Sequence, residues 1–419
     1  MMEYTELCRR CVDMNALVSW KVHSSTDMVF RILNSIPMHF SEENNTKFEK
    51  LFSEIYKNVD LWHETIIRDY VISVIEKIHN GIDIYKDGDA KQQWKNFSEK
   101  TPQEYTVGFP VYGLILDKSI QVGPFTLYSK QDFIEYLQGL SKAARNAMEE
   151  SAEKNKSLYW ITKKVKANSG QRAQELSRPY FELFEHVARF FLQDTTRHDI
   201  GIFKFKSWEI RYGCAFSVDD GFQQIYAQGA SRPIQASELI AKSGNKQIWE
   251  IVGRYCDDRE KKTKQKKCTE METRLINAII WIGSANYENS EVNKYIQYVF
   301  AIEGLLAYKP KGTIITPSIA HQLAEWAAFI IGEDAKIDVI SKEELRVKMY
   351  SAMKKVYDKR SRIVHGNDND IKASDMVRVS EVAYCLVGSI LNNRDVLSAS
   401  SMEQIQKWVD LRKFGEKLK

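Results

Sequence analysis

The sequence predicts an α+β protein in which a mixed N-terminal region precedes an all-α bundle. Apolar residues recur at helical spacing in much of residues 1–100 and throughout residues 268–415. Between them, residues 105–128 are rich in β-forming residues and are broken by glycine and proline, a pattern typical of short strands and turns. We therefore expect three regions: a mainly helical one over 1–100, an α+β one over 101–256, and a helical bundle over 268–415.

Two long helices are expected in the first region. One follows Asn45, with apolar residues at positions 48, 51, 52, 55 and 56. The other covers about 61–80 and ends at Gly81, a residue that suits a helix terminus. Residues 85–100 carry many charges and are interpreted as a connection.

The middle region is expected to mix strands with helices. Residues 105–128 predict a hairpin or a small sheet, and residues 200–228 predict two or three further strands. Residues 130–150 and 170–193 return to helical spacing. A charge-dense junction over 257–267, interpreted as a linker or a solvated helix start, separates this region from the bundle.

Six helices are expected after the junction, because apolar periodicity alternates with short polar loops. Helices joined by short loops are typical of an antiparallel bundle. The predicted helices lie near 268–285, 290–308, 316–332, 342–364, 371–392 and 401–415.

Length and composition restrict the class of protein. The chain has 419 residues, more than one core usually holds, and 43% of them are hydrophobic, which favours a globular protein with several domains. No stretch reaches the length of about 18 apolar residues that a membrane span requires, and the first 16 residues lack the pattern of a secretory signal. We therefore expect a cytoplasmic location without a membrane partner.

The six cysteines are scattered, which favours reduced thiols over a disulfide framework. Cys8 and Cys11 have the spacing of a metal knuckle, but no second pair of ligands follows at a suitable distance. Two cysteines on one helical face are the favoured interpretation.

The end of the helix predicted over 342–364 holds the most informative residues. An apolar stripe leads to it, formed by Leu345, Met349, Ala352 and Val356. Arg360 occupies the next position of this stripe, although a permanently charged guanidinium is costly to bury without a partner. His365 follows five residues later, beside Gly366, which suits a helix cap. This pattern favours a phosphate-binding role over a purely structural one.

The same helix is strongly basic. Residues 346–362 carry seven Lys or Arg and a single acid, Asp358, although the whole chain has a net charge of only +4. Such a local positive field suits a polyanion, and Lys354, Lys355 and Lys359 are candidate RNA contacts. A solvated helix face with flexible lysines is the alternative.

Residues 357–367, Tyr-Asp-Lys-Arg-Ser-Arg-Ile-Val-His-Gly-Asn, resemble the Arg-x(4–6)-His signature of the HEPN superfamily, and most closely its ApeA-like branch. Two further segments are similar to earlier helices of that branch: Tyr298-Val-Phe-Ala-Ile-Glu303-Gly-Leu-Leu and Ala320-His-Gln-Leu-Ala-Glu-Trp-Ala. The resemblance covers about 268–415.

The resemblance implies a HEPN helical bundle that acts as a metal-independent endoribonuclease, with no cofactor. HEPN ribonucleases occur in toxin–antitoxin, CRISPR and anti-phage systems, so it also implies an abortive-infection effector or toxin. It further implies a homodimer, an RNA substrate with transfer RNA as one candidate, and a phage-derived trigger. Residues 1–256 would then sense the trigger, inhibit the nuclease or select its substrate.

The residue types fit this chemistry. RNA carries a 2′-hydroxyl beside each phosphate, so cleavage requires alignment, proton transfer and stabilisation of negative charge. Arginine supplies a bidentate fork for phosphate oxygens, and histidine exchanges protons near neutral pH. Arg360 and His365 are therefore the candidate catalytic residues for a transesterification that leaves a 2′,3′-cyclic phosphate.

Spacing restricts how the two residues meet. Five residues along an ideal helix rotate by about 140°. Either the helix ends before His365, or the site is assembled from two copies of the motif. The resemblance implies both.

Four supporting residues and several alternatives complete the sequence-based account. Ser361 fills a position where the family commonly has a polar residue, and Arg362 is a second phosphate contact. Tyr357 offers a ring for base stacking, and Glu303 is an acid that orients Arg360. Alternatively, Arg360 pairs with Glu303 for stability, Tyr357 only packs, and His365 only caps the helix. His321 is interpreted as a core histidine. The rival function is a non-catalytic HEPN protein that binds RNA or dimerises.

Overall fold

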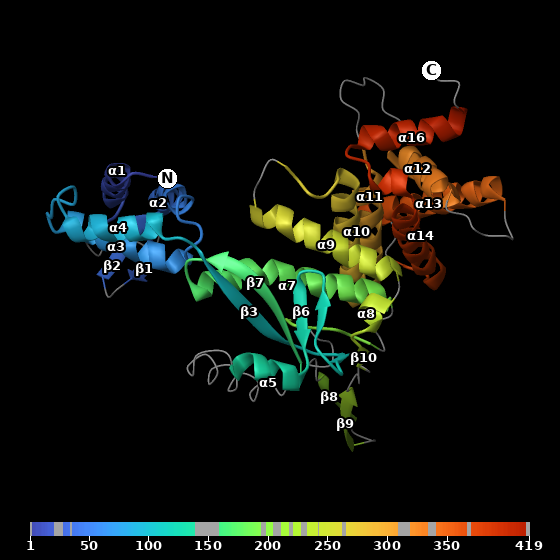
Figure 1. Ribbon diagram of the computed structural model, residues 1–419, viewed down its shortest axis with the longest axis horizontal. Helices are drawn as coiled ribbons and strands as arrows, with labels where there is room; N and C mark the ends of the chain where they lie inside the picture. The colour runs from blue at the N-terminus through green and yellow to red at the C-terminus, as the bar shows by residue number, and fades with distance from the viewer. Residues whose placement is uncertain are drawn as a thin grey trace. The chain divides into compact units, whose positions relative to one another are not determined.

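The computed structural model describes residues 2–20, 28–33, 36–138, 159–193, 198–203, 211–217, 221–227, 233–241, 243–261, 265–308, 319–333, 341–366 and 370–415. It confirms the α+β class, with small sheets in the N-terminal half and a helical C-terminal region (Figure 1). Two compact units make up the chain: Met1–Val107 with Lys163–Pro179, and Gly108–Thr162 with Tyr180–Lys419. The junction predicted at 257–267 therefore lies inside the second unit and does not divide the two.

The described residues of the first unit include four helices and an antiparallel strand pair. Both predicted long helices are present, and residues 85–100, interpreted as a connection, contain a further helix. That helix was not predicted because its charges mask three apolar residues, Ala90, Trp94 and Phe97, which it buries. The elements are α1 (Tyr4–Asn15), β1 (Met28–Leu33), β2 (Ile36–Ser41), α2 (Glu42–Tyr56), α3 (Glu64–His79) and α4 (Gly88–Glu99).

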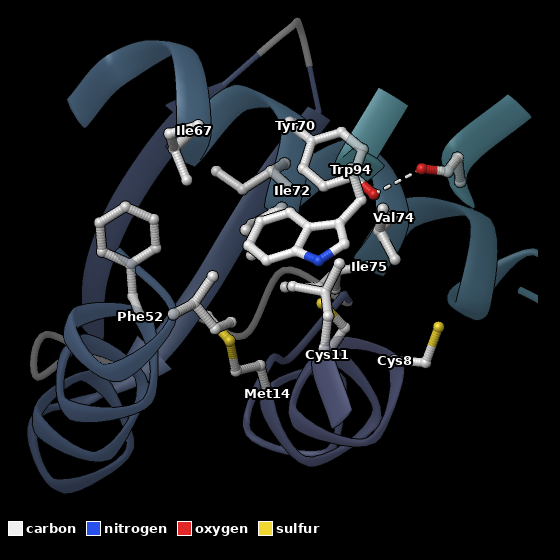
Figure 2. Packing of buried hydrophobic residues seen from close by; sticks show 14 of the residues in the cluster. Cys8, Cys11, Met14, Phe52, Ile67, Tyr70, Ile72, Val74, Ile75 and Trp94 are labelled. Atoms are coloured by element: carbon white, nitrogen blue, oxygen red, sulfur yellow. Dashed lines mark hydrogen bonds between the residues drawn. The ribbon is translucent and has the colours of Figure 1, made fainter. Parts of the chain in front are cut away.

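The core of the first unit explains the cysteine pair. Cys8 and Cys11 point from α1 into an apolar cluster that includes Trp94 and Tyr70, as Figure 2 shows. The hydroxyl of Tyr70 donates a hydrogen bond of 2.8 Å to the carbonyl oxygen of Ala90. Burial raises the pKa of both thiols, which disfavours the thiolate form that binds metals. The interpretation of two cysteines on one helical face is confirmed.

A four-stranded sheet with the order β3-β7-β6-β5 includes the predicted hairpin. The hairpin joins β5 (Ile120–Val122) to β6 (Phe125–Tyr128), and Gly123 in its turn has a φ of +55°. β3 (Gln103–Val111) and β7 (Tyr159–Ala167) each have residues in both units, and the sequence analysis did not predict β7. The remaining strands form two short pairs: β4 (Leu114–Ile115) with β10 (Ile234–Gln235), and β8 (Arg211–Ser217) with β9 (Gly221–Ala227).

The helices of the second unit include all six that were predicted after residue 268. They begin where the chain provides caps: Thr269 and Glu272 form a capping box, and Ser290 and Ser341 accept hydrogen bonds from the next helix. These helices are α10 (Glu270–Tyr287), α11 (Glu291–Leu306), α12 (Ile319–Glu333), α13 (Lys342–Val364), α14 (Ala373–Asn392) and α16 (Met402–Phe414), with a short α15 (Arg394–Leu397) before the last. The start predicted for α12, at residues 316–318, lies outside the described residues.

Between the first unit's helices and the bundle, the described residues include four further helices: α5 (Lys130–Gln138), α7 (Gly170–Leu192), α8 (Glu238–Ala241) and α9 (Ser243–Lys261). α5 and α7 fulfil the two helical predictions for this region, although residues 139–150 of the first prediction lie outside the described part. The sequence analysis missed α9 because the charged junction that begins at residue 257 overlaps the end of this helix. The buried residues of α9, Ile248 to Cys256, lie before that junction. Among the helices of the described ranges, none is both long and apolar enough to span a membrane.

A close helix contact and a buried polar cluster join α7 to the bundle. A Cβ at Gly283 of α10 would overlap the backbone carbonyl oxygen of His186 in α7. Nearby, the side-chain amide of Asn286 donates to the carbonyl oxygen of Arg189 at 2.9 Å, and Arg189 is paired with Asp199 at 3.1 Å. The α+β part and the bundle therefore share one core in the second unit.

We predict that Gly283→Ala destabilises the protein by about 1 to 3 kcal/mol, because overpacking forces the two helix backbones apart. Gly388→Ala is the matched control, since a Cβ at that position in α14 meets no heavy atom within 4 Å. That control is expected to be neutral or stabilising, as alanine favours a helix interior. Denaturant unfolding followed by circular dichroism measures both, and equal midpoints for the two variants would refute the close contact.

Candidate active site at the end of helix α13

Buried contacts hold α13 against the bundle. Of the predicted apolar stripe, Leu345 and Val356 are buried, whereas Met349 and Ala352 are half-buried, and Met353 and Ile363 complete the buried face. The hydroxyl of Tyr295 in α11 donates a hydrogen bond of 3.0 Å to the carbonyl oxygen of Val356. The sequence analysis did not identify Tyr295, because a tyrosine on an apolar helix face looks like any packed aromatic residue.

Arg360 lies where the stripe would continue and is paired with Glu303 of α11. Its Nε lies 3.4 Å from Oε1 of Glu303, and their side chains are 25% and 20% exposed. Its guanidinium carbon lies 5.6 Å from the ring centre of Tyr357, within the range of a cation–π contact. The prediction that Glu303 is the acid beside Arg360 is confirmed.

The environment of this pair opposes the charge on Glu303. Burial raises the pKa of Glu303, and the positive charge of Arg360 acts in the opposite direction. Burial also raises the pKa of Tyr357, with a smaller contribution from Glu303. The carboxylate is therefore an energetically costly partner for Arg360.

His365 terminates α13 through its backbone. Its N–H donates to the carbonyl oxygen of Ser361 at 3.0 Å, and Gly366, with a φ of +72°, donates to Ile363 at 3.0 Å. The side chain of His365 is exposed, and within the described part of the chain its imidazole has no hydrogen-bond partner. The glycine cap predicted from the sequence is confirmed.

The helical residues of α13 end at Val364, and His365 is the C-cap, with φ −85° and ψ 7°. The first of the two geometric alternatives, a helix that ends before His365, is therefore what α13 adopts. The N–H of His365 still makes the helical hydrogen bond to Ser361, so its backbone stays close to the helical path, on which Arg360 and His365 would point about 140° apart. Both side chains reach solvent: His365 is exposed and Arg360 is partly exposed.

Lys359 does not fit its predicted role as an RNA contact. It is 4% exposed, and its ammonium donates to the backbone carbonyl oxygen of Asp370 and lies 3.9 Å from the carboxylate of Asp375. A buried ammonium held by these partners cannot reach a phosphate without leaving both of them. The partners were not predicted because the local sequence does not show that Asp370 and the first turn of α14, which carries Asp375, pack against α13.

The positive field along α13 is weaker than the sequence predicts. Arg346 is paired with Glu333 at 2.9 Å, and Lys348 with Glu344 at 2.8 Å. Lys354, Lys355 and Arg362 are exposed, and Ser361 is half-buried. Of the seven basic residues, the exposed lysines are the ones best placed to contact a polyanion.

His321 differs from its sequence-based interpretation. It is exposed at the start of α12, and its Nδ1 lies 2.9 Å from the hydroxyl of Tyr350 in α13. The interpretation as a core histidine was wrong, because His321 occupies the polar edge of an otherwise apolar helix. Tyr350 was also missed, although it stands seven residues before Tyr357 and thus on the same helix face.

Comparisons with family models, curated proteins and solved structures give no match to this chain. No group of three or more His, Cys, Asp or Glu in the described ranges is placed to hold a metal ion. The motif and the geometry around α13 are thus the observations that bear on function.

We predict that Glu303 makes stability fall as pH rises. Since its pKa is raised in the folded state, the folded chain binds this proton more tightly than the unfolded chain, whose glutamates titrate at about 4.3. Glu303 therefore makes its full contribution to the free energy of unfolding below the unfolded-state pKa. This contribution is lost as pH rises through the folded-state pKa. The unfolding free energy of wild type, relative to Glu303→Gln, is expected to decrease as pH rises above about 4.3.

Unfolding curves at several pH values measure both proteins. An increase with pH would mean that Arg360, and not burial, dominates the environment of Glu303.

Proposed function

We propose that this protein is a metal-independent endoribonuclease of the HEPN type, related to the ApeA-like branch. The observation that carries the proposal is the end of α13, where an exposed imidazole follows a partly exposed guanidinium held in place by two side chains. The reaction is attack of a 2′-hydroxyl on the adjacent phosphorus. It forms a 2′,3′-cyclic phosphate and releases the 5′-oxygen of the next nucleotide.

Arg360 binds the phosphate in this proposal. Glu303 and Tyr357 hold the guanidinium, so that it does not have to be ordered when the substrate arrives. A phosphate oxygen competes with the carboxylate of Glu303, whose charged form burial disfavours. The guanidinium then stabilises the negative charge that develops on the phosphate oxygens.

His365 moves the protons. An imidazole without a partner in the described structure is free to accept the proton of the 2′-hydroxyl or to protonate the leaving oxygen. Lys354, Lys355 and Arg362 contribute positive charge that attracts RNA. Ser361 remains a supporting residue, whereas Lys359 is left out because it is buried.

A homodimer would bring the two catalytic residues together. On an ideal helix the two side chains would point about 140° apart, so Arg360 of one copy and His365 of a second copy would form each site. The hydrogen bond from the N–H of His365 to Ser361, which keeps its backbone close to the helical path, and the resemblance to HEPN proteins support this arrangement.

The remaining proposals concern biology. The protein would act in the cytoplasm as an anti-phage abortive-infection toxin, on RNA such as transfer RNA, after a phage-derived trigger. Its N-terminal part, residues 1–256, would restrain the nuclease until then. Removing residues 1–267 is a poor test of that role, because it would also remove His186 and Arg189, which contact α10.

The alternative is a non-catalytic HEPN protein that binds RNA or dimerises. The ion pair between Arg360 and Glu303 favours it, because the guanidinium already has an anionic partner.

We predict that Arg360→Ala and His365→Ala each slow RNA cleavage by about 100- to 10,000-fold, the range for loss of a proton-transfer or charge-stabilising group. Lys348→Ala, which removes a lysine paired within α13, is expected to cleave as wild type does. Gel analysis of RNA incubated with purified protein measures the rates, and mapping of the ends should show 2′,3′-cyclic phosphates. RNA binding without cleavage by all four proteins would support the alternative function.

A further inference from the structure

Five residues of α13 form a continuous ridge that ends at the candidate catalytic histidine. At about 100° per residue they fall within about 80° of arc around the helix axis. Their spacing of 4, 3, 4 and 4 residues keeps them on one face over a length of about 22 Å. The ridge consists of Tyr350, Lys354, Tyr357, Ser361 and His365.

The side chains of the ridge reach solvent. Lys354 and His365 are exposed, and the other three residues are half-buried. The ring of Tyr350 is held from α12 by His321, and the ammonium of Lys354 lies 5.9 Å from the centre of that ring. The ring of Tyr357 faces the guanidinium of Arg360. Positioned aromatic rings thus alternate with positive or polar groups.

We infer that this ridge is a binding track for single-stranded RNA that leads to His365. Aromatic rings stack on unpaired bases without sequence preference, and interleaved cations follow the phosphates. Its length suits several nucleotides of one strand. A duplex hides its base faces, so it would not use the rings. The identification of RNA as the ligand of this track rests on the proposed function.

The charges around the ridge define its extent. Glu343 lies on the same face, two helical turns before Tyr350, and is exposed. Its negative charge would repel a phosphate, so the track begins at Tyr350. Asp358 is exposed beside the ridge, and Lys355 points about 100° away from Lys354. The two adjacent lysines therefore differ: Lys354 belongs to the track and Lys355 does not.

The test measures binding apart from cleavage. Fluorescence anisotropy follows the full-length protein with a short, labelled single-stranded RNA that carries 2′-O-methyl groups and so cannot react at the 2′ position. Tyr350→Leu is expected to raise the Kd about 5- to 100-fold, the range for loss of one base–aromatic stack. Lys354→Gln is expected to reduce the slope of log K against log salt by about 0.7, the value for one lost phosphate contact.

Two matched variants serve as controls. Tyr350→Phe keeps the ring but loses the hydrogen bond to His321, and Lys348→Gln removes an exposed lysine that is paired with Glu344 on another face of α13. Both are expected to bind nearly as wild type does. Equal losses for Lys354→Gln and Lys348→Gln, an unchanged Kd for Tyr350→Leu, or duplex RNA bound as tightly as the single strand would each overturn the track.

Failure of the track and failure of the nuclease proposal are distinguishable. If wild type does not cleave RNA but the binding pattern holds, the track stands and the nuclease proposal fails. If wild type cleaves RNA and the pattern is absent, only the track fails.

Discussion

The rotation of α13 about its own axis is the constraint on which the candidate site depends. Two buried contacts fix it. The hydroxyl of Tyr295 donates to the carbonyl oxygen of Val356, and the ammonium of Lys359 donates to the carbonyl oxygen of Asp370. A helix held by both contacts cannot rotate without exposing a buried lysine or leaving polar groups unpaired, and either is costly. The same rotation places His365 in solvent and Arg360 at the edge of the core.

The position of Arg360 explains why stability and function compete at this site. A guanidinium at the edge of an apolar core needs an anion, and Glu303 supplies one from α11. The burial that brings them together disfavours the carboxylate, so the pair is a modest contribution to stability. In the proposed enzyme, that same weakness allows a phosphate to replace the carboxylate, while Tyr357 keeps the guanidinium in place.

The sequence predicted the features that depend on residues close together in the chain, such as helix caps and apolar periodicity. The bundle helices could be placed because serine caps such as Ser341 and the glycine at position 366 mark their ends, and apolar periodicity fills the intervals. α4 and α9 were missed because charges obscured their buried faces. The burial of Lys359 and the pairing of His321 with Tyr350 could not be predicted, since each depends on which element of another part of the chain packs against α13. The acid beside Arg360 was predictable only because a candidate segment on an earlier helix contains Glu303.

Mixing two inactive variants tests most directly whether α13 supplies its arginine and its histidine to different sites. If each site takes Arg360 from one copy and His365 from the other, a mixture of Arg360→Ala and His365→Ala subunits forms one intact site in each mixed dimer. RNA cleavage by the coexpressed pair should then clearly exceed cleavage by either variant alone. A coexpressed pair that assembles yet stays as inactive as its members would contradict the shared site.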